Sequence, residues 1–512
     1  MENSMKRLAT LVRIHKLEII AVTAVLVLAA FLRLYHLREF TIFLGDEGRD
    51  ALVVKHMIVD HKFTLLGPTA SVGGFYLGPS YYYFMIPFLY IFRLDPVGPA
   101  VMVALFGIAT VALLYWAMRS WVGPNAALVS ALLYASAPGV VSASRSSWNP
   151  NIMPFFSLLS TAALINALKT KKPIWYLISG IAFGIAIQSH YLGLIIGPIL
   201  AVSTLLGEPM KRWFKTAVLE IMGFATGASL FIAFEIRHAF PNTRSIIEFV
   251  ARGGGTTGPR SLNLFWLFFE MLRRTYEAVL APFDLIVKLT LVVSLFTTIF
   301  SMYRLKTKSG KLAPSMLVVL VWLIVGVYGI GTYQGQLYPH YFGFLFPLPF
   351  VLIGITFREL FQLKKLRLLI VSLAIGLSAF NLTQQKVWGT GSNLIDQTAN
   401  VSRRIGEVAE GKSFNFALLS TGNSDHAYRY YLEIMGQAPK GLEEEVTQQL
   451  IVICENPDAV CQPLGNPLWE IAGFGRAEIV SETKVDPGIR ILKLIHHKDS
   501  EDLIGKPAPK GG

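Results

Sequence analysis

Long apolar segments recur along most of the chain. Between Leu17 and Phe380 the sequence contains repeated runs of about 20 mostly apolar residues, the length that an α-helix needs to cross a bilayer. The runs do not alternate apolar with polar positions, so they are not typical of a transmembrane β-barrel. The pattern predicts a polytopic α-helical membrane protein. We expect spans at residues 17–34, 98–118, 125–143, 152–168, 174–189, 192–206, 216–236, 284–303, 313–331, 341–357 and 368–386.

Basic residues between the spans predict the orientation. Clusters such as Lys169 to Lys172 and Lys211 to Lys215 fall on the cytoplasmic side if the N-terminus is inside, and Lys and Arg accumulate on that side. We therefore expect about 11 spans in the cytoplasmic (plasma) membrane, with the C-terminal part outside. The first run has a basic flank, as a signal peptide has. No small-residue cleavage site follows it, so we expect a retained helix.

Residues 79–93 (PSYYYFMIPFLYIFR) are apolar but short, and they contain Pro87 and three consecutive tyrosines. Counting this segment as a span would move the later basic clusters outside. We therefore expect an interfacial or partly inserted helix on the outer side of the membrane.

The composition changes after the last span. The pattern there predicts a small α/β unit. We expect helices near 393–410, 425–436 and 467–473, and strands at 414–420, 449–455, 477–485 and 489–495. The expected domains are a transmembrane domain at 1–386 with outer loops at 35–96 and 237–283, an extracytoplasmic α/β domain at 387–498, and a disordered tail at 499–512.

Composition and charge exclude other classes. Of the 512 residues, 53% are hydrophobic and 15% are charged, whereas a soluble domain has about 25% charged residues. The net charge of +13 could indicate a nucleic-acid partner. The basic residues lie in short clusters between apolar runs, and no aromatic residues alternate with them on a soluble platform. We therefore expect no nucleic-acid binding and attribute the charge to membrane topology.

The two cysteines, Cys454 and Cys461, lie in the predicted outer domain. In an oxidising compartment the segment CENPDAVC can close a disulfide loop, which would stabilise the fold by about 2–3 kcal/mol. Two free buried thiols are the alternative. A metal pair is disfavoured because no histidine or further cysteine clusters beside them.

Adjacent acids, Asp46 and Glu47, lie in the first outer loop and are followed by Arg49 and Asp50. Acids near the membrane are costly unless they pair, bind an ion or take part in chemistry. Neighbouring carboxylates can divide the work, because one can deprotonate a hydroxyl while the other orients the acceptor or binds a metal. The alternative is a solvated helix start, since acids are favoured in a first helical turn.

Three further polar junctions lie at predicted outer ends of spans. Each could be an ordinary helix end or interfacial anchor, but together they could converge on a phosphate-bearing ligand. The first, SRSSWNPN, contains Arg145, Asn149 and Asn151. The second and third, SHYLG and YPHYF, contain His190 and Tyr191, and Tyr338, His340 and Tyr341.

Residues 251–260 (ARGGGTTGPR) cannot form a stable helix or strand. The segment lacks the GK[ST] ending of a P-loop and is predicted to face outward. We expect a mobile flap carrying Arg252 and Arg260, with a plain flexible connector as the alternative.

These features resemble the GT-C membrane glycosyltransferases, in particular the branch of protein O-mannosyltransferases and aminoarabinose transferases. The resemblance rests on the Asp-Glu pair after the first span, on GPSYYY, on WVGPNAALVSALLYASAPGVVSASRSSWNPN and on YPHYFGFLFPLPFVLIG, and covers roughly residues 15–385. Two features depart from the branch. The tail is not a β-trefoil, and Leu77-Gly78-Pro79 replaces the usual His-Pro.

The resemblance implies an inverting enzyme that moves a sugar from a polyprenyl-phosphate donor to a glycan, lipid or protein hydroxyl on the outer face. It implies that Asp46 is the general base and that Glu47 assists or positions the acceptor. Donor phosphate would be held by Arg49, Arg145, His190, Tyr191, Tyr338, His340 and Tyr341, and the acceptor or flap would involve Tyr82, Asn149, Asn151, Arg252 and Arg260. The resemblance does not settle the cofactor: Asp46 and Glu47 could hold a divalent metal, but the sequence shows no compelling set of further ligands.

Two other functions fit a membrane protein of this kind. A transporter or flippase would place polar residues near the bilayer midplane, often in broken helices. The charges within spans, Glu220, Glu235 and Lys288, lie toward span edges instead. A scaffold that only displays the tail would not need the acid pair. The sequence therefore favours the enzyme.

Overall fold

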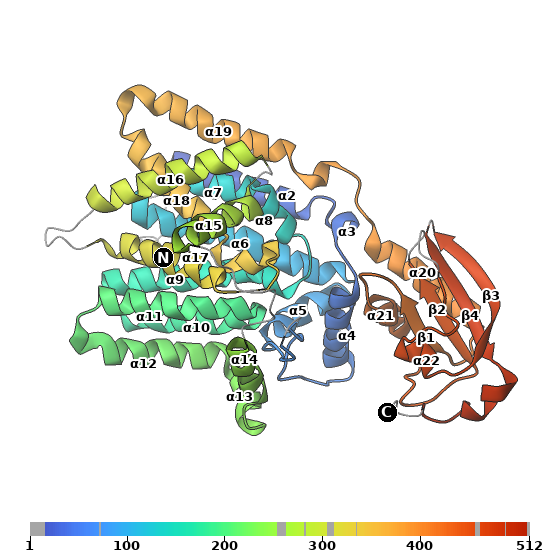
Figure 1. Cartoon of the computed structure of the whole chain (residues 1–512). Helices are drawn as coiled ribbons and strands as arrows, with labels where there is room; N and C mark the ends of the chain where they lie inside the picture. The colour runs from blue at the N-terminus through green and yellow to red at the C-terminus, as the bar shows by residue number, and fades with distance from the viewer. Residues whose placement is uncertain are drawn as a thin grey trace, which may run out of the picture. The chain divides into compact units, whose positions relative to one another are not determined.

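The computed structural model describes residues 16–70, 73–252, 263–280, 283–304, 312–333, 335–455, 461–486 and 488–508. The chain forms two compact units. The first, here called the helical unit, comprises Met1–Leu37, Phe63–Phe88 and Gly98–Thr390. The second, the tail unit, comprises Arg38–Lys62, Leu89–Val97 and Gly391–Gly512. Figure 1 labels the α-helices and β-strands of both units.

The helical unit consists of α-helices and short 3-10 helices. In chain order these are α2 (Lys16–Leu34), α5 (Ser80–Ile91), α6 (Val97–Val122), α7 (Pro124–Ser136), α8 (Pro138–Ala143), η1 (Asn149–Ile152), α9 (Met153–Thr170), α10 (Pro173–Ser189), η2 (Tyr191–Ile195), α11 (Ile196–Gly207), α12 (Met210–Gly227), α13 (Ser229–Arg237), α14 (Pro241–Ala251), α15 (Leu264–Val279), α16 (Asp284–Arg304), α17 (Pro314–Gly331), η3 (Pro339–Leu345), α18 (Leu348–Phe361), η4 (Lys364–Leu366), α19 (Arg367–Thr383) and η5 (Lys386–Trp388). The end of α5 and the first residue of α6 belong to the tail unit.

The predicted polytopic α-helical membrane protein is confirmed. Within the described residues, six helices are long and apolar enough to cross a membrane: Lys16–Leu34, Val97–Val122, Asn149–Thr170, Asp284–Arg304, Pro314–Gly331 and Lys364–Thr383. Two bent pairs, α12 with α13 and η3 with α18, bring the number to as many as eight, and α10 and η2–α11 are shorter apolar helices. The figure of about 11 spans stays a prediction.

Several predicted spans contain breaks that the apolar pattern does not show. The span expected at 125–143 is divided between α7 and α8, because Pro138 cannot continue a helix and Ala137 before it is extended. The span at 216–236 bends by 81° between α12 and α13. The span at 341–357 begins as 3-10 helix and bends by 50° before α18.

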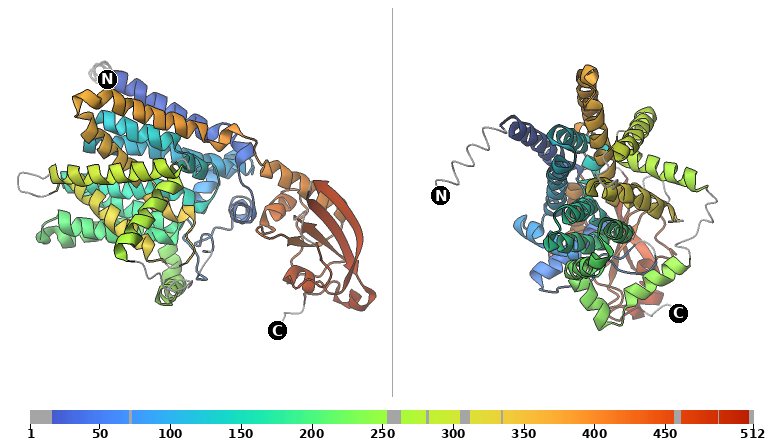
Figure 2. Two further views of the ribbon diagram at one scale, coloured as in Figure 1. Left: turned by 45° about the horizontal axis from the view of Figure 1, so that its top comes forward. Right: turned by 90° about the vertical axis from the view of Figure 1, so that its left-hand side faces the viewer.

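Glycines bring α10 and α12 close together. A Cβ on Gly180 would lie 2.1 Å from the Glu220 carbonyl, and one on Gly223 would lie 2.2 Å from that of Leu177. Gly184 and Gly227 approach the opposite backbone in the same way. Glycines four residues apart on each helix therefore form a small-residue contact, the kind that membrane helices use to pack. The two helices run side by side in Figures 1 and 2.

The tail unit contains the predicted α/β fold. Its elements are α3 (Leu37–Phe40), α4 (Gly45–Val59), α20 (Leu394–Ala409), β1 (Asn415–Leu419), α21 (His426–Ile434), β2 (Gln449–Cys454), α22 (Trp469–Ala472), β3 (Ala477–Asp486), β4 (Ile489–His496) and η6 (Lys498–Leu503). The sheet has the order β1-β2-β4-β3. β1 pairs parallel to β2, with Asn415 opposite Leu450, and the other pairs are antiparallel.

Both faces of the sheet are covered, which explains why β2 is apolar from Leu450 to Cys454. Ile451 and Ile453 pack with α20 and α21 on one face. Leu450 and Val452 pack on the other face, with Phe474. The predicted helices and strands of this domain are present within about two residues of their expected limits, the usual uncertainty of element boundaries.

The C-terminal residues are ordered where the structure describes them. The prediction of disorder from Asp499 onward is wrong for residues 499–508, because η6 covers Lys498–Leu503 and the following backbone is hydrogen-bonded to a distant segment. Gly505 N donates to Val446 O at 2.9 Å and Ala508 N donates to Leu442 O at 2.8 Å. Such a contact leaves no local pattern in the sequence. Residues 509–512 lie outside the described residues.

Part of the first loop belongs to the tail unit. The predicted domain 1–386 includes residues 38–62 and 89–97, which the structure groups with the tail. Arg38 joins these segments, because its guanidinium contacts Asp95 at 2.6 Å and Asp396 at 2.7 Å. Tyr430 adds a bond from its hydroxyl to Leu94 O at 2.7 Å.

Candidate functional site

The first turn of α4 carries the Asp46–Glu47 pair. The helix begins after Leu44, which is extended. Leu44 N donates to Glu47 Oε2 at 3.2 Å, and Gly45 N donates to Asn423 Oδ1 at 2.8 Å. These bonds satisfy amide groups that a helix start leaves without a partner inside the helix.

The two adjacent acids lie in opposite environments. The Asp46 side chain is 50% exposed, and its Oδ1 accepts a bond from Arg49 Nη1 at 2.9 Å. Glu47 is buried, and this burial raises its pKa to about 7. Asp46 and Asp50 raise the pKa of Glu47 further, while its bonds from backbone amides lower it. Of these two acids, Asp46 is therefore the one that is open to a substrate.

Arg49 holds a third acid behind this pair. Its Nε and Nη2 donate to Asp50 Oδ1 at 3.0 and 2.9 Å, and Asp50 is fully buried. The same guanidinium thus connects a buried carboxylate to the exposed Asp46 carboxylate. Fixing a side chain through a second group in this way is how sites hold reacting groups in place. The binding of donor phosphate by Arg49 stays a prediction.

One face of α4 packs against α21, and the two helices run in the same direction. A Cβ on Gly45 would lie 2.0 Å from Ser424 Oγ, and one on Gly48 would lie 2.3 Å from Ala427 N. At the other end, Lys55 and His56 both contact Glu433, at 2.7 and 2.8 Å. These positions recur with the spacing of one helical face. The two helix N-termini consequently meet at the acid pair, where their dipoles favour negative charge.

His426, at the start of α21, borders the acid pair. Its Nδ1 lies 2.8 Å from Ser424 Oγ. Burial lowers the pKa of His426, Asp425 and Asp46 raise it, and Arg49 and Arg429 lower it further. The imidazole is thus within electrostatic reach of Asp46 and Arg49.

The three other polar junctions converge within the helical unit. We call Trp148, His190, Tyr191, His340 and Tyr341 the histidine–aromatic cluster. The His340 ring lies 4.3 Å from Trp148, 5.6 Å from His190 and 4.6 Å from Tyr341, between ring centroids. The His190 ring lies 4.4 Å from Tyr191 and 4.7 Å from Tyr341. The sequence alone did not determine which of these segments meet.

His190 is a neutral donor at physiological pH. It is buried, and this burial, with a smaller effect of His340, lowers its pKa to about 3. Its Nδ1 accepts a bond from Leu192 N at 3.2 Å. The proton of the neutral ring is therefore on Nε2, and that nitrogen can donate to an oxygen.

Arg145 has a structural role in the helical unit. It is buried, and its Nη1 and Nη2 donate to the carbonyl oxygens of Leu32 and Tyr35 at 2.7 and 2.8 Å. A guanidinium at this position satisfies carbonyls that the C-terminus of α2 would otherwise leave exposed. Its role toward a donor phosphate stays a prediction.

The remaining predicted residues differ in their surroundings. Asn149 Nδ2 donates to Ser189 O at 2.6 Å and so ties two junctions together. Asn151 Nδ2 donates to Ser146 O at 3.0 Å, within one junction. Tyr82 is buried, whereas Tyr338 is 44% exposed and stacks on His340 with ring centroids 5.9 Å apart.

The predicted flap lies mostly outside the described residues. Arg260 is among these undescribed residues, so its role stays a prediction. Arg252 is described and forms an exposed ion pair with Glu248 at 3.2 Å.

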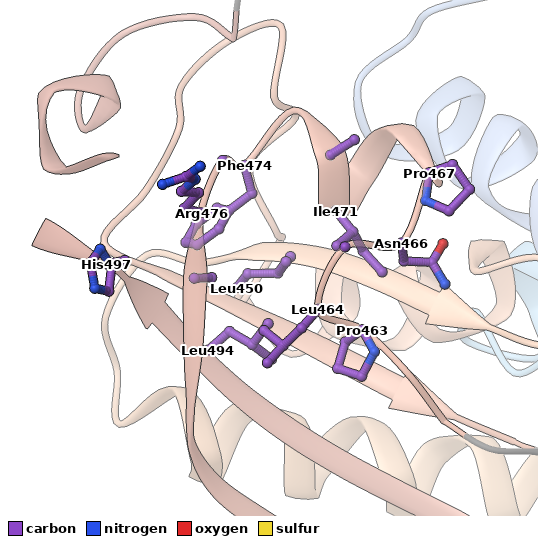
Figure 3. Close-up of a pocket in the computed structure, with 14 residues that line it drawn as sticks. Leu450, Pro463, Leu464, Asn466, Pro467, Ile471, Phe474, Arg476, Leu494 and His497 are labelled. Carbon is purple, nitrogen blue, oxygen red and sulfur yellow. The ribbon is translucent and has the colours of Figure 1, made fainter. Parts of the chain in front are cut away.

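Cys454 and Cys461 are joined in a disulfide, with their Cα atoms 6.1 Å apart. Among the described residues, no three His, Cys, Asp or Glu side chains gather in a group that could hold a metal ion. Figure 3 shows a separate cavity of about 630 Å³ in the tail unit, lined by apolar side chains such as Leu450 and Phe474, with Arg476 and His497 at one side. None of the predicted site residues lines this cavity.

Sequence reasoning missed the residues that fix the acid pair. The glycines of GDEG, at 45 and 48, are a detectable signal, because two glycines three residues apart in a helix indicate a close contact on one face. Asn423, His426 and Glu455 carry no such signal. Their importance depends on which part of the tail meets α4, and that requires the fold.

Known proteins share this fold. A family model described as dolichyl-phosphate-mannose-protein mannosyltransferase matches residues 77–235. The crystal structure of ArnT from Cupriavidus metallidurans bound to undecaprenyl phosphate is 14% identical, with a TM-score of 0.60, covering 93% of this chain and 97% of that one. The oligosaccharyltransferase AglB from Archaeoglobus fulgidus, in complex with an inhibitory peptide and a dolichol-phosphate, is 13% identical, with a TM-score of 0.55, covering 85% and 69%.

No curated protein matches the chain by sequence. The predicted resemblance to the GT-C membrane glycosyltransferases is nevertheless confirmed, because the family model and the two structures all point to that group. The fold is of the GT-C type, and the protein is an integral membrane protein.

Proposed function

We propose that this protein is a glycosyltransferase that moves a sugar from a polyprenyl-phosphate donor to an acceptor hydroxyl on the outer face of the cytoplasmic membrane. The observation that carries this proposal is the divided acid pair on α4, with Asp46 half-exposed and Glu47 buried, in a fold of the GT-C type. ArnT bound to undecaprenyl phosphate and AglB bound to a dolichol-phosphate support the class of donor.

Asp46 is the general base in this proposal. Its carboxylate takes the proton of the acceptor hydroxyl, and the acceptor oxygen forms a bond to the anomeric carbon of the sugar. The bond from that carbon to the phosphate oxygen breaks, and the polyprenyl phosphate leaves with the electron pair. Attack from the side opposite the phosphate inverts the configuration. The ion pair with Arg49 orients the Asp46 carboxylate for this step.

Glu47 acts as a positioning residue. Its carboxylate is buried and accepts a bond from Leu44 N, so it holds the start of α4 and does not face an acceptor. In this proposal Glu47 does not contact the acceptor. It supports the neighbouring base, Asp46.

The histidine–aromatic cluster supplies donors for the phosphate. His190 can donate through Nε2 without first gaining a proton, because its ring is neutral and its Nδ1 is occupied. Neutral donors in a buried site stabilise charge on a leaving phosphate without the cost of burying a cation. His340 and Tyr341 adjoin His190, and Tyr338, outside the cluster, stacks on His340 and adds a further hydroxyl.

The experiment is mass spectrometry of lipid that co-purifies with the protein from its native membrane. We expect a polyprenyl-phosphate sugar, and we expect a sugar-free polyprenyl phosphate to accumulate when membrane acceptors are added back. Protein that retains no such lipid, and that releases no polyprenyl phosphate from mannosyl-, glucosyl- or aminoarabinosyl-phosphoundecaprenol, would exclude the proposal. If the protein binds the polyprenyl-phosphate sugar and moves it across the bilayer without releasing polyprenyl phosphate, it is a flippase instead.

A further inference from the structure

The tail unit holds the first turn of α4 at the carboxyl ends of its two parallel strands. Asn423 follows β1, and Glu455 follows β2 directly. In open α/β sheets the crevice beyond the carboxyl ends of parallel strands is where ligands commonly bind. In this protein a helix start occupies that position, namely the turn that carries Asp46.

The side-chain amide of Asn423 both accepts and donates hydrogen bonds. Its Oδ1 accepts bonds from Gly45 N at 2.8 Å and from Ser424 N at 2.9 Å. Its Nδ2 donates to Glu455 Oε1 and Oε2 at 2.9 and 3.1 Å. The side chain is therefore fixed by one partner in the tail while it binds the backbone of α4.

Glu455 is itself held in place. Tyr428 donates from its hydroxyl to Glu455 Oε1 at 2.7 Å, and Glu455 N donates to Leu419 O at 3.1 Å. Glu455 also follows Cys454, one half of the disulfide. A continuous set of bonds thus runs from the sheet through Glu455 and Asn423 to Gly45, the residue before Asp46.

The close packing of α4 limits the movements that this set of bonds has to restrain. Gly45 leaves no space for a Cβ against Ser424, and Gly48 leaves none against α21, so α4 cannot shift toward this segment. The Asn423 bond to Gly45 N, together with the bond from Leu44 N to Glu47, restrains the first turn against rotation and fraying. Helix ends fray when their amides lack a partner.

We propose that Asn423 and Glu455 are positioning residues that set the orientation of Asp46, so that the C-terminal part of the tail unit takes part in the reaction. This inference rests on the proposed function for its effect on turnover. The tail's hold on α4 itself can be tested without any donor.

The first measurement is hydrogen–deuterium exchange of the full chain in detergent, followed on peptides that cover residues 44–52. Asn423→Ala should raise the exchange of this segment by at least about tenfold, because Gly45 N loses its acceptor. Glu455→Gln should leave exchange close to that of the unsubstituted protein, since an amide oxygen can still accept from Asn423. Glu455→Ala should again raise it.

Asn415→Ala is the matched control. Asn415 is also a bonded asparagine of the tail, and it contacts the backbone of Lys440, Glu445 and Thr447 but no residue of α4. Its substitution should lower the melting temperature while leaving exchange at 44–52 unchanged. Unchanged exchange at 44–52 in Asn423→Ala would overturn the inference. An increase in exchange at 44–52 in Asn415→Ala as large as the increase in Asn423→Ala would also overturn it.

The second measurement is sugar release from the polyprenyl-phosphate sugar that the unsubstituted protein turns over. Asn423→Ala should lower kcat at least about tenfold with KM for the donor within about twofold, and Glu455→Gln should restore kcat relative to Glu455→Ala. Equal loss in kcat for Asn423→Ala and Asn415→Ala would overturn the positioning role. If the unsubstituted protein turns over none of the donors while exchange responds as expected, the proposed function fails and the structural link stands.

Discussion

At the scale of single residues, the same side-chain type acquires different properties from its surroundings. Asp46 and Glu47 are neighbours, yet one is half-exposed and paired with Arg49, and the other is buried against the backbone. The sequence predicts that such a pair can divide its work. It does not say which acid is buried, because that depends on the contact between α4 and α21.

The buried Glu47 predicts a pH-dependent stability. Its pKa is about 7 in the folded protein, whereas in the unfolded chain it titrates near its ordinary value of 4.5. As the pH rises, the unfolded chain loses this proton at a lower pH than the folded protein does. The stability that protonated Glu47 contributes below pH 4.5 is therefore lost as the pH rises through about 7. Glu47→Gln removes the titration and keeps an acceptor for Leu44 N. Its melting temperature should therefore match the unsubstituted protein at pH 4.5 and exceed it at pH 8.

Thermal melting in detergent between these pH values checks this prediction. Glu407→Gln, which replaces an exposed glutamate of α20, is the control and should not change the pH dependence. A Glu47→Gln difference that is the same at both pH values would contradict the burial of an ionisable Glu47.

At the scale of elements, glycine spacing explains how α4 docks. The GDEG segment places Gly45 against Ser424 and Gly48 against Ala427, so both glycines lie on the face of α4 that meets α21 and the residue pair before it. The acids lie in the first turn of a helix, as in the alternative of a solvated helix start, but Glu47 is buried and not solvated. The docking partner was not predictable, because the contact joins positions 378 residues apart, such as Lys55 and Glu433.

Gly48→Ala tests this docking. Its Cβ would lie 2.3 Å from Ala427 N, a backbone atom that cannot move alone, so we expect a loss of about 1–3 kcal/mol and a lower melting temperature. Gly376→Ala is the control, because this α19 glycine has no atom within 4 Å of the added Cβ. The control should be neutral or slightly stabilising. Equal melting of the two variants would contradict the close contact.

The elements of the chain were predictable to different degrees. The tail's helices and strands follow from local periodicity, as in β2, whose apolar run reflects burial on both faces. The break at Ala228 was not predictable, since an apolar run looks the same whether it is straight or bent, whereas Pro347 marks the break after Phe346. The order of residues 499–508 depends on bonds to residues 442–446, far away in the sequence.

At the scale of the whole molecule, the charge pattern predicts the topology. The basic clusters are expected inside, and the polar junctions that form the histidine–aromatic cluster are expected outside. Residues that meet in one cluster share one side of the membrane, whereas the orientation, with that side outside, stays a prediction. Sequence alone could predict a common side but not the contacts.

Cysteine labelling tests the topology. In a background with Cys454→Ser and Cys461→Ser, Lys171→Cys should react with an impermeant maleimide only after the cells are opened. Ser142→Cys, at the exposed end of α8, should react in intact cells. Labelling of Lys171→Cys in intact cells would reverse the orientation.

The central claim is that Asp46 takes the acceptor's proton, and Asp46→Asn tests it most directly. The amide keeps the size of the side chain and an oxygen for Arg49, but it cannot accept the proton. We expect Asp46→Asn to retain the melting temperature and the co-purifying lipid, and to lose sugar transfer by at least about 10²-fold in kcat, as removal of a general base does. Full transfer by Asp46→Asn, in the assay that detects turnover by the unsubstituted protein, would contradict the account.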